Sequence, residues 1–524
     1  MKKLMIGAAA IALLTACGPN DKPADVKEPT LKELVVRQGD PAKAADALAA
    51  MSLTDTGTGV LSFAGKTIDG SSATFTDLGI TGEDAVTVGS LVFDGLDMND
   101  GAATFGKLSL NNITMASPDE EGTVKVGSIE LVNPSAELAG WLAGTLNGQE
   151  VPFPAADKVV FDSWSMSGLS GVFNDADADG TMGIDKIEIR DMTDLKAAKA
   201  MISGISVDVV DNDEGMDVKM KLGSLSMTNI DAKFVKAIQE NIGDEDALMA
   251  AIMDVAYENP MDPGYDSFKM DDLSFDVAGA SFAIPALTAS VERNSAGQPV
   301  KYVTQPYTMT LKADAEGGEA GAGLLQGLSV IGYEELTMKG ESVATYDPDK
   351  DIVSFDAKKN YFELVDGAKF SFGGKLEGYN AYTKEVGTSF NFADLAEGAE
   401  PDPAAMQAAM GKLTIHGFEL SIKDDSLLDR GFNAAATMQG QDPEQMKQQI
   451  GMGLAMAPML LGDSGVDMTL VSEATGALSK FVSDGGTLTI KLDPKTPLSV
   501  ASMMENPDPA SFTKDSLGFS ASQK

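Results

Sequence analysis

The chain has 524 residues, of which 43% are hydrophobic and 23% are charged, a composition that argues against wholesale disorder. The charge is one-sided, with 79 acidic residues against 39 basic ones and a formal net charge of −40. Such an acidic surface repels nucleic acid and anionic lipid headgroups and attracts cations, so it argues against a nucleic-acid-binding protein.

The first sixteen residues are typical of an export signal. Two lysines, Lys2 and Lys3, precede an apolar run from Leu4 to Leu14, and two small residues follow it. The apolar run is too short to span a bilayer. We therefore expect residues 1–16 to be a signal peptide.

The only cysteine of the chain, Cys17, follows this segment directly. The sequence Leu14-Thr15-Ala16-Cys17 resembles the lipobox of bacterial lipoproteins, in which cysteine follows a leucine and two small residues. The resemblance implies that Cys17 becomes the first mature residue and carries a diacylglycerol on its sulfur and usually a third acyl chain on its amine. Two or more acyl chains hold a protein stably at a membrane. An ordinary signal peptide with a cysteine nearby is the alternative.

In Gram-negative lipoproteins, an aspartate after the cysteine favours retention in the inner membrane, so Gly18 favours the outer membrane. Without another cysteine the exported chain forms no disulfide, and its fold must depend on its core. Residues 17–30 are polar and contain three prolines, so they are expected to form a flexible tether.

A nine-residue phrase recurs through the body of the chain with the frame apolar-x-x-[Leu/Ile/Trp]-x-apolar-x-x-apolar. Its central pair, such as Leu91 and Phe93, alternates as in a strand. The outer pair, Val88 and Leu96, has the opposite parity, so either both faces of the strand meet apolar surroundings or the strand bends near its glycine. The copies begin at residues 88, 105, 126, 161, 184, 222, 270, 333 and 410.

The first copies start 17 and 21 residues apart, which fits one long strand plus one turn. Turn residues separate them at 99–101, 118–122 and 211–215. We expect an antiparallel meander with strands of about 10–13 residues, longer than the usual length. Helical periodicity is expected at 41–52, 135–146, 231–257 and 392–410.

The C-terminal part is helix-like and rich in methionine from 424 to 483, with Pro458 interrupting the apolar segment 443–461, and a strand is expected at 485–492. The predicted fold is α+β and β-rich: a long-stranded antiparallel meander that could curve into a groove, with helical insertions and a helix-rich C-terminal part. We expect an N-terminal β-repeat domain at 31–320 and a C-terminal domain at 321–524. The clustered methionines suit either core packing or a lipid-contacting face.

The candidate metal ligands are Asp175, Asp177 and Asp179, which alternate before Gly180 and could wrap Ca²⁺. An EF-hand needs an acidic residue at loop position twelve, where this chain has Lys186, and the flanks are strand-like. An acidic hairpin turn is therefore the leading alternative. Residues 347–351 are expected to form a turn, and 59–67 a strand and turn, because no helix follows to complete a phosphate loop.

No catalytic group stands out in the sequence. His416, the only histidine, would have to serve any Ser-His-Asp triad, but no nucleophile elbow accompanies it. A cluster of His and Cys ligands cannot be assembled. We expect a non-enzymatic protein without a cofactor other than Ca²⁺, with a hydrolase as an alternative.

The repeated phrase resembles the strand phrases of AsmA-like envelope proteins of Gram-negative bacteria. That resemblance implies long antiparallel sheets curled into apolar grooves, which in some members hold or move lipids; a lipobox here replaces their transmembrane helix. We expect an envelope lipoprotein anchored in the outer membrane, facing the periplasm or the cell surface. It would bind or shield an apolar, lipid-like ligand or act as a scaffold, with a lipid or an envelope protein as its partner. A Ca²⁺-stabilised surface or adhesion protein is the alternative.

Overall fold

The chain divides into two compact units, which are treated separately. The computed structural model describes residues 29–54, 61–80, 83–116, 122–146, 148–149, 151–174, 178–193, 196–211, 217–231, 255, 258–314, 318–389, 403–461, 465–505 and 512–524. The N-terminal unit contains residues 27–239 and 264–281, and the C-terminal unit contains 240–263 and 282–524. The division lies earlier than the expected boundary at 320, because the strand at 299–313 pairs with the strand at 335–347 inside the C-terminal unit.

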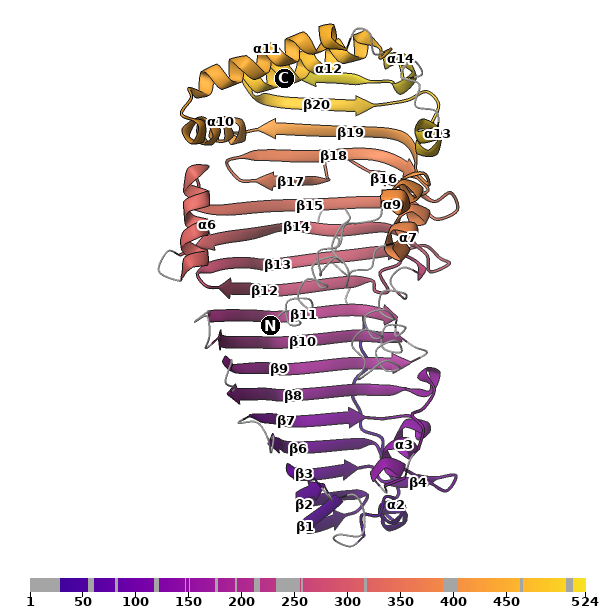
Figure 1. Cartoon of the computed structure of the whole chain (residues 1–524). Coiled ribbons are helices and arrows are strands. Elements are labelled where there is room, and N and C mark those ends of the chain that lie inside the picture. The colour runs from indigo at the N-terminus through magenta and orange to yellow at the C-terminus, as the bar shows by residue number, and fades with distance from the viewer. Residues whose placement is uncertain are drawn as a thin grey trace. The chain divides into compact units, whose positions relative to one another are not determined.

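The main sheet of the N-terminal unit is an antiparallel meander in which each strand pairs with the next (Figure 1). Among the described residues, a short hairpin and two α-helices accompany it. The strands of the main sheet are β1 (Leu61–Asp69), β2 (Ser72–Ile80), β3 (Glu83–Asp94), β6 (Lys107–Ala116), β7 (Thr123–Val132), β8 (Phe161–Asn174), β9 (Ala178–Thr193), β10 (Lys196–Asp211), β11 (Asp217–Asp231) and β12 (Ser267–Val277). The hairpin is β4 (Asp97–Asn99) with β5 (Ala102–Thr104), and the helices are α2 (Ala44–Ala50), α3 (Ala136–Leu146) and the short 3₁₀ turn η2 (Ala156–Lys158).

The C-terminal unit also has an antiparallel sheet, with helices beside its strands and at one end. Its strands are β13 (Ala280–Arg293), β14 (Pro299–Ala313), β15 (Glu335–Asp347), β16 (Ile352–Phe355), β17 (Tyr361–Leu364), β18 (Ala368–Glu377), β19 (Thr414–Asp424), β20 (Gly486–Leu492), β21 (Leu498–Ser499) and β22 (Ser520–Gln523). Its helices are α6 (Glu319–Val330), α7 (Tyr379–Ser389), α9 (Pro403–Met410), α10 (Leu427–Gln439), α11 (Pro443–Leu460), α12 (Met468–Asp484), α13 (Val500–Glu505) and α14 (Lys514–Leu517). Helices α6, α7 and α9 lie beside the strands of this sheet, and α11 and α12 lie at one end of it (Figure 1). Phe481 of α12 packs with Leu488 of β20 and Ala521 of β22 in a small core.

The β-rich antiparallel meander with a helix-rich C-terminal part is confirmed. Each copy of the nine-residue phrase overlaps a strand, and the helices expected at 41–52 and 135–146 are α2 and α3. Most of the segment 231–257 and the start of 392–410 lie outside the described residues. The sequence missed α6 and α7. Pro458 does not interrupt α11, because it sits two residues before the helix end, where the lost backbone hydrogen bond belongs to the last turn.

A crease across the sheet of the N-terminal unit explains the parity of the phrase. Every second strand of the sheet, namely β2, β6, β8, β10 and β12, has one residue with a positive φ. The pairing register aligns these residues in a single row that crosses the sheet. They are Asp77 (53°), Asn112 (54°), Gly168 (66°), Gly204 (66°) and Asp272 (55°). On the intervening strands β3, β7 and β11 the facing position is glycine. A Cβ at Gly89 would lie 3.0 Å from that of Asn112, and one at Gly223 would lie 3.1 Å from that of Asp272.

The crease brings residues of opposite parity onto one face. Val88 and Leu91 are three positions apart on β3 and would point to opposite sides of a regular strand. Both are buried in the same hydrophobic cluster, as are Ile113 and Leu108 on the neighbouring strand. Of the two explanations for the phrase, the strand bends near its glycine.

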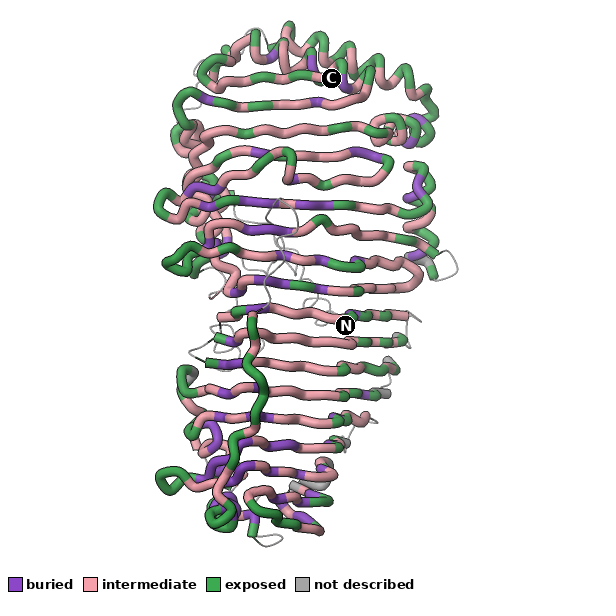
Figure 2. The backbone as a smooth tube through the Cα atoms, turned by 180° about the vertical axis from the view of Figure 1, so that it is seen from behind, coloured by how far each residue is buried: buried purple, intermediate pink, exposed green. Residues whose placement is uncertain are grey.

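The segment 29–40, here called the strap, crosses the strands of the N-terminal unit (Figure 2). The backbone N–H of Lys32 donates to Asp191 Oδ2 at 3.0 Å, and that of Arg37 donates to Asn133 Oδ1 at 2.8 Å. Asp191 and Asn133 both have φ of 52° and lie near the strand ends, away from the crease. The predicted tether therefore joins the unit beside β9.

Substitution of a crease glycine should destabilise the N-terminal unit. Gly204 has a φ of 66°, and an added Cβ would lie 2.1 Å from Asp185 Oδ2. We expect Gly204→Ala to lower the free energy of unfolding by about 1–2 kcal/mol, because a side chain in the left-handed region is strained. Urea unfolding of the full chain measures this.

The matched control is Gly140→Ala in α3, where an added Cβ meets no atom within 4 Å. This change should leave stability unchanged or raise it by about 0.5–1 kcal/mol, since alanine favours a helix. Equal effects of the two substitutions would contradict the role given to the crease.

Candidate functional site

The main sheet of the N-terminal unit carries rows of apolar side chains on one side. Directly paired residues of antiparallel strands point to the same side, so the register defines rows across the sheet. Two such rows, here called the apolar face, run from β2 to β12. The first is Ala73, Phe93, Leu108, Leu131, Trp164, Ile189, Ala200, Met227 and Phe268; the second is Phe75, Leu91, Leu110, Ile129, Met166, Ile187, Ile202, Leu225 and Met270.

The row between these two points to the opposite side and is mostly polar. Within it, Ser109 donates to Glu130 at 3.4 Å, and Glu130 also accepts an ion pair from Lys107 at 2.8 Å. One side of the sheet is therefore apolar and the other is mostly polar. The row is Thr74, Val92, Ser109, Glu130, Ser165, Glu188, Met201, Ser226 and Lys269.

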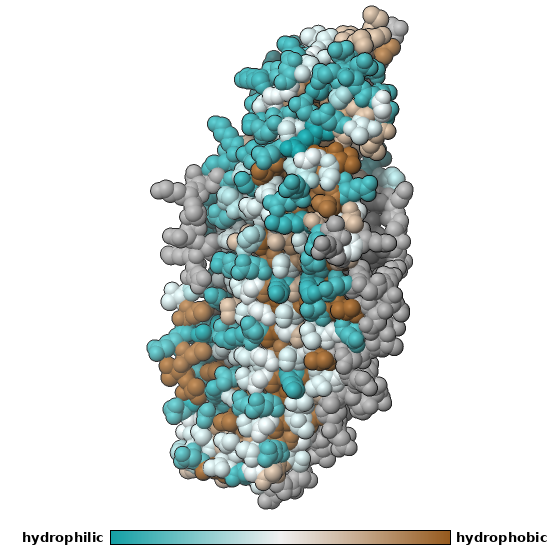
Figure 3. Space-filling view, turned by 90° about the vertical axis from the view of Figure 1, so that its left-hand side faces the viewer, coloured by the Kyte–Doolittle hydropathy of each residue, from teal (hydrophilic) through white to brown (hydrophobic). Residues whose placement is uncertain are grey.

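The apolar side chains become more exposed from β8 to β11, whereas Phe268 and Met270 on β12 are buried. Met166, Ile187, Ile202 and Leu225 of the second row are only half-buried. Further exposed hydrophobic side chains lie near the strand ends, but on both sides of the sheet. Met182 of β9 pairs with Gly171 and Val207, whereas Val172 of β8 and Val210 of β10 lie in rows of the opposite parity. On the side drawn in Figure 3, brown hydrophobic residues run through the lower part of the view among hydrophilic ones.

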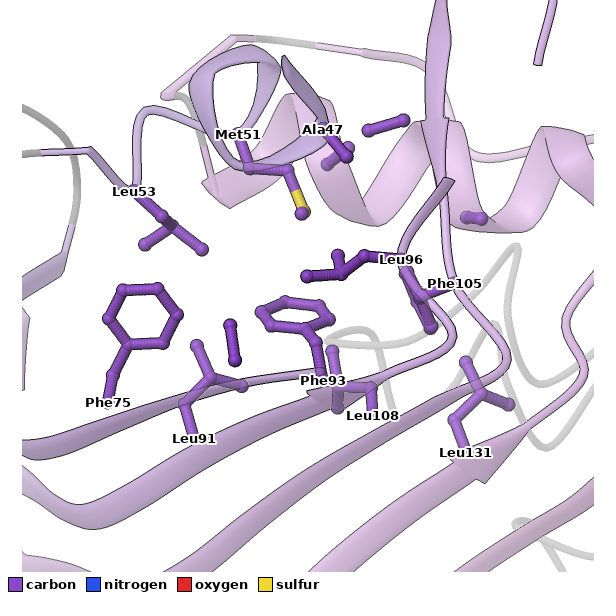
Figure 4. Close-up of a cluster of buried hydrophobic side chains, with 14 of the residues drawn as sticks. Ala47, Met51, Leu53, Phe75, Leu91, Phe93, Leu96, Phe105, Leu108 and Leu131 are labelled. Carbon is purple, nitrogen blue, oxygen red and sulfur yellow. The ribbon is translucent and has the colours of Figure 1, made fainter. Parts of the chain in front are cut away.

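At β1–β7 the same face is closed by α2, the β4–β5 hairpin and α3 (Figure 4). Met51, which follows α2, and Leu53 lie over Phe75, Leu91 and Phe93, and all of these are fully buried. Edge-to-face ring contacts add to this packing, with 4.9 Å between the centroids of Phe63 and Phe75 and 5.3 Å between those of Phe93 and Phe105. One end of the apolar face is thus an ordinary core.

Most of the predicted site residues lie outside the part of the chain that the structure describes. Cys17, Asp175 and Asp177 are outside the described residues, so both the acylation and the Ca²⁺ hypotheses stay predictions. Asp179 is exposed at the start of β9, where it pairs with Asn174 and Val210, and the flanks are strands as expected. Within the described ranges, no group of three His, Cys, Asp or Glu side chains is placed to hold a metal ion.

The other sequence candidates have structural placements. Residues 61–69 form β1 and 348–351 form a turn, as expected for both segments. His416 lies on β19, and its Nε2 is 2.7 Å from Glu377 Oε2 on β18. This is a partly exposed ion-pair geometry, and a hydrolase remains an untested alternative.

The sequence missed a buried carboxyl group in the C-terminal unit. Glu341 on β15 is 6% exposed and lies opposite Tyr361 of β17, to which it is hydrogen bonded. Burial raises the pKa of Glu341, although Tyr361 and the nearby Lys369 and Lys359 act against that shift. Its Oε1 has no hydrogen-bond partner among the described residues. Nothing in the local sequence distinguishes Glu341 from an exposed strand residue.

Glu341→Gln should stabilise the protein at neutral pH. Because the pKa of Glu341 is raised above 4.5 in the folded state, the folded state holds the proton more tightly than the unfolded state. Stability therefore falls as the pH rises from the ordinary value through the raised one. We expect the variant to melt higher than the unsubstituted protein at pH 7, and the difference to vanish at pH 4.

Thermal unfolding at the two pH values measures this, with Glu334→Gln as the control, since Glu334 is exposed. If the variant melted lower than the unsubstituted protein at pH 7, the claim that burial of the charged Glu341 carboxylate destabilises the folded protein would be contradicted.

Comparison with known proteins names no activity. A family model described as "Uncharacterized protein" matches residues 361–524, which run from β17 to the C-terminal end. No curated protein and no solved structure matches the chain. Among the described residues, none of the helices combines the length and apolar character needed to cross a membrane.

Proposed function

We propose that this protein is a non-enzymatic envelope lipoprotein, anchored at Cys17 in the outer membrane, whose N-terminal unit binds or shields an apolar, lipid-like ligand. The observation that carries the proposal is the apolar face. Its rows are continuous from β2 to β12. They are mostly buried under α2 and α3 at one end, half-buried from β8 to β11, and buried again on β12.

The geometry suits an elongated apolar molecule. Neighbouring strands lie about 4.8 Å apart, so the half-buried part of the rows, from β8 to β11, extends roughly 14 Å, a length comparable to a large part of an acyl chain. Removing apolar surface from water contributes about 25 cal/mol per Å² and needs no directional partner. The face would therefore accept chains of varied chemistry, while the polar row behind it stays hydrated.

Two further features support the cellular setting. The lipobox resemblance supports a lipid anchor at a membrane. The strap fixes the end of the predicted tether beside β9 through Asp191 and Arg190. The net charge of −40 argues against nucleic acid as a partner. A lipid or an envelope protein is the expected partner.

Site-specific photocrosslinking tests the proposal. The photoreactive residue p-benzoylphenylalanine at position 202 would replace Ile202 on the apolar face. At position 201 it would replace Met201, the adjacent residue of the opposite row. We expect irradiated cells to yield lipid adducts at position 202 and none at position 201, because neighbouring residues of a strand point to opposite sides.

Two results would count against ligand binding by the apolar face. Equal adducts at both positions would indicate non-specific contact with the membrane. Adducts to protein alone at position 202 would instead favour a scaffold that docks another polypeptide on this face.

A further inference from the structure

Helix α11 has apolar side chains that are exposed and do not pack against the other described parts of the protein. The helix begins at a well-formed cap, where Asp442 accepts from the backbone N–H of Glu444 at 2.9 Å and of Gln445 at 3.1 Å. Its inner side holds half-buried residues, including Met446 and Leu454. Gly451 is also on that side, and a Cβ there would lie 3.7 Å from Ser479 Oγ of α12.

The outer side of α11 changes character along the helix. In the first half it is polar, with Glu444, Gln445, Gln448 and Gln449. In the second half it becomes apolar and stays in solvent. The residues of this methionine face are Met452 (61% exposed), Met456 (52%), Met459 (80%) and Leu460 (76%). Their spacing of four, three and one residues places them on one side of the helix.

The charges indicate what this face meets. The twelve residues from Ile450 to Leu461 contain no charged side chain, whereas 23% of the whole chain is charged. A second copy would bring another net charge of −40 against the first, so self-association is opposed. An anionic lipid surface is opposed for the same reason. A neutral lipid surface meets no such repulsion.

We propose that the methionine face of α11 inserts into the interface of an electrically neutral phospholipid bilayer. Methionine suits this role, because its flexible, polarizable side chain adapts to irregular apolar surroundings. An interfacial helix of this kind binds weakly by itself and adds to a lipid anchor as a second membrane contact. The contact lies in the C-terminal unit and does not depend on ligand binding by the apolar face.

Tryptophan fluorescence in lipid vesicles tests the proposal with the full chain. Met459→Trp places a reporter on the methionine face, and Met438→Trp places a matched one on α10, where Met438 is 81% exposed but lies on another helix. With phosphatidylcholine vesicles whose acyl chains are brominated, we expect the added emission at 459 to be quenched and shifted to shorter wavelength. The emission at 438 should be unchanged. The unsubstituted protein supplies the background of Trp141 and Trp164.

A second substitution sharpens the test. Adding Met456→Lys to the Met459→Trp protein should restore the emission, because a charge on the face opposes insertion. Absence of quenching at 459, or equal quenching at 459 and 438, would overturn the proposal. A wavelength shift at 459 that grows with protein concentration in the absence of vesicles would overturn it in favour of a second copy of the chain.

Discussion

In the N-terminal unit, alternate strands carry a residue in the left-handed region at the same position across the sheet, and the strands between mostly offer a glycine that makes room for it. Each such residue costs free energy unless it is glycine, or an asparagine or aspartate, which tolerate the conformation best. The crease uses these three residue types: Gly168 and Gly204, Asn112, and Asp77 and Asp272. The remainder of the unit depends on this arrangement, because it sets which side chains share a face.

With the crease in place, a phrase whose apolar positions have mixed parity becomes a sheet with one apolar and one polar side. Val88 and Leu91 then contribute to the same core, although a regular strand would separate them. Because the chain has one cysteine and cannot form an internal disulfide, its stability depends on bringing these apolar residues together in one core. At β1–β7 the apolar side is closed by α2 and α3. From β8 to β11 the same rows continue as a half-buried surface, which is the basis of the proposed function.

Much of the fold was predictable because its signals are local. Turn residues and the recurring phrase located the strands that carry a copy of the phrase, and the periodicity of 135–146 located α3. Strands without a copy, such as β10 and β14, were missed. The parity of Val88 and Leu96 allowed a bend near the glycine as one of two explanations. The sequence could not show that the bend falls in register on neighbouring strands, because that alignment is a property of the pairing. The strap was missed for a similar reason: its partners, Asp191 and Asn133, are distant in sequence. Glu341 was missed because its burial depends on Tyr361 of another strand. For the candidate site, the sequence predicted only that an apolar surface would lie on a long sheet. It did not identify the residues of that surface.

The most direct measurement of the central claim is the intact mass of the full-length protein, extracted from its own membranes and sprayed under conditions that preserve non-covalent complexes. The account predicts a species heavier than the acylated polypeptide by the mass of one or more lipids, which organic solvent removes. A single species at the mass of the polypeptide with its covalent acyl chains alone, before and after solvent treatment, would contradict it.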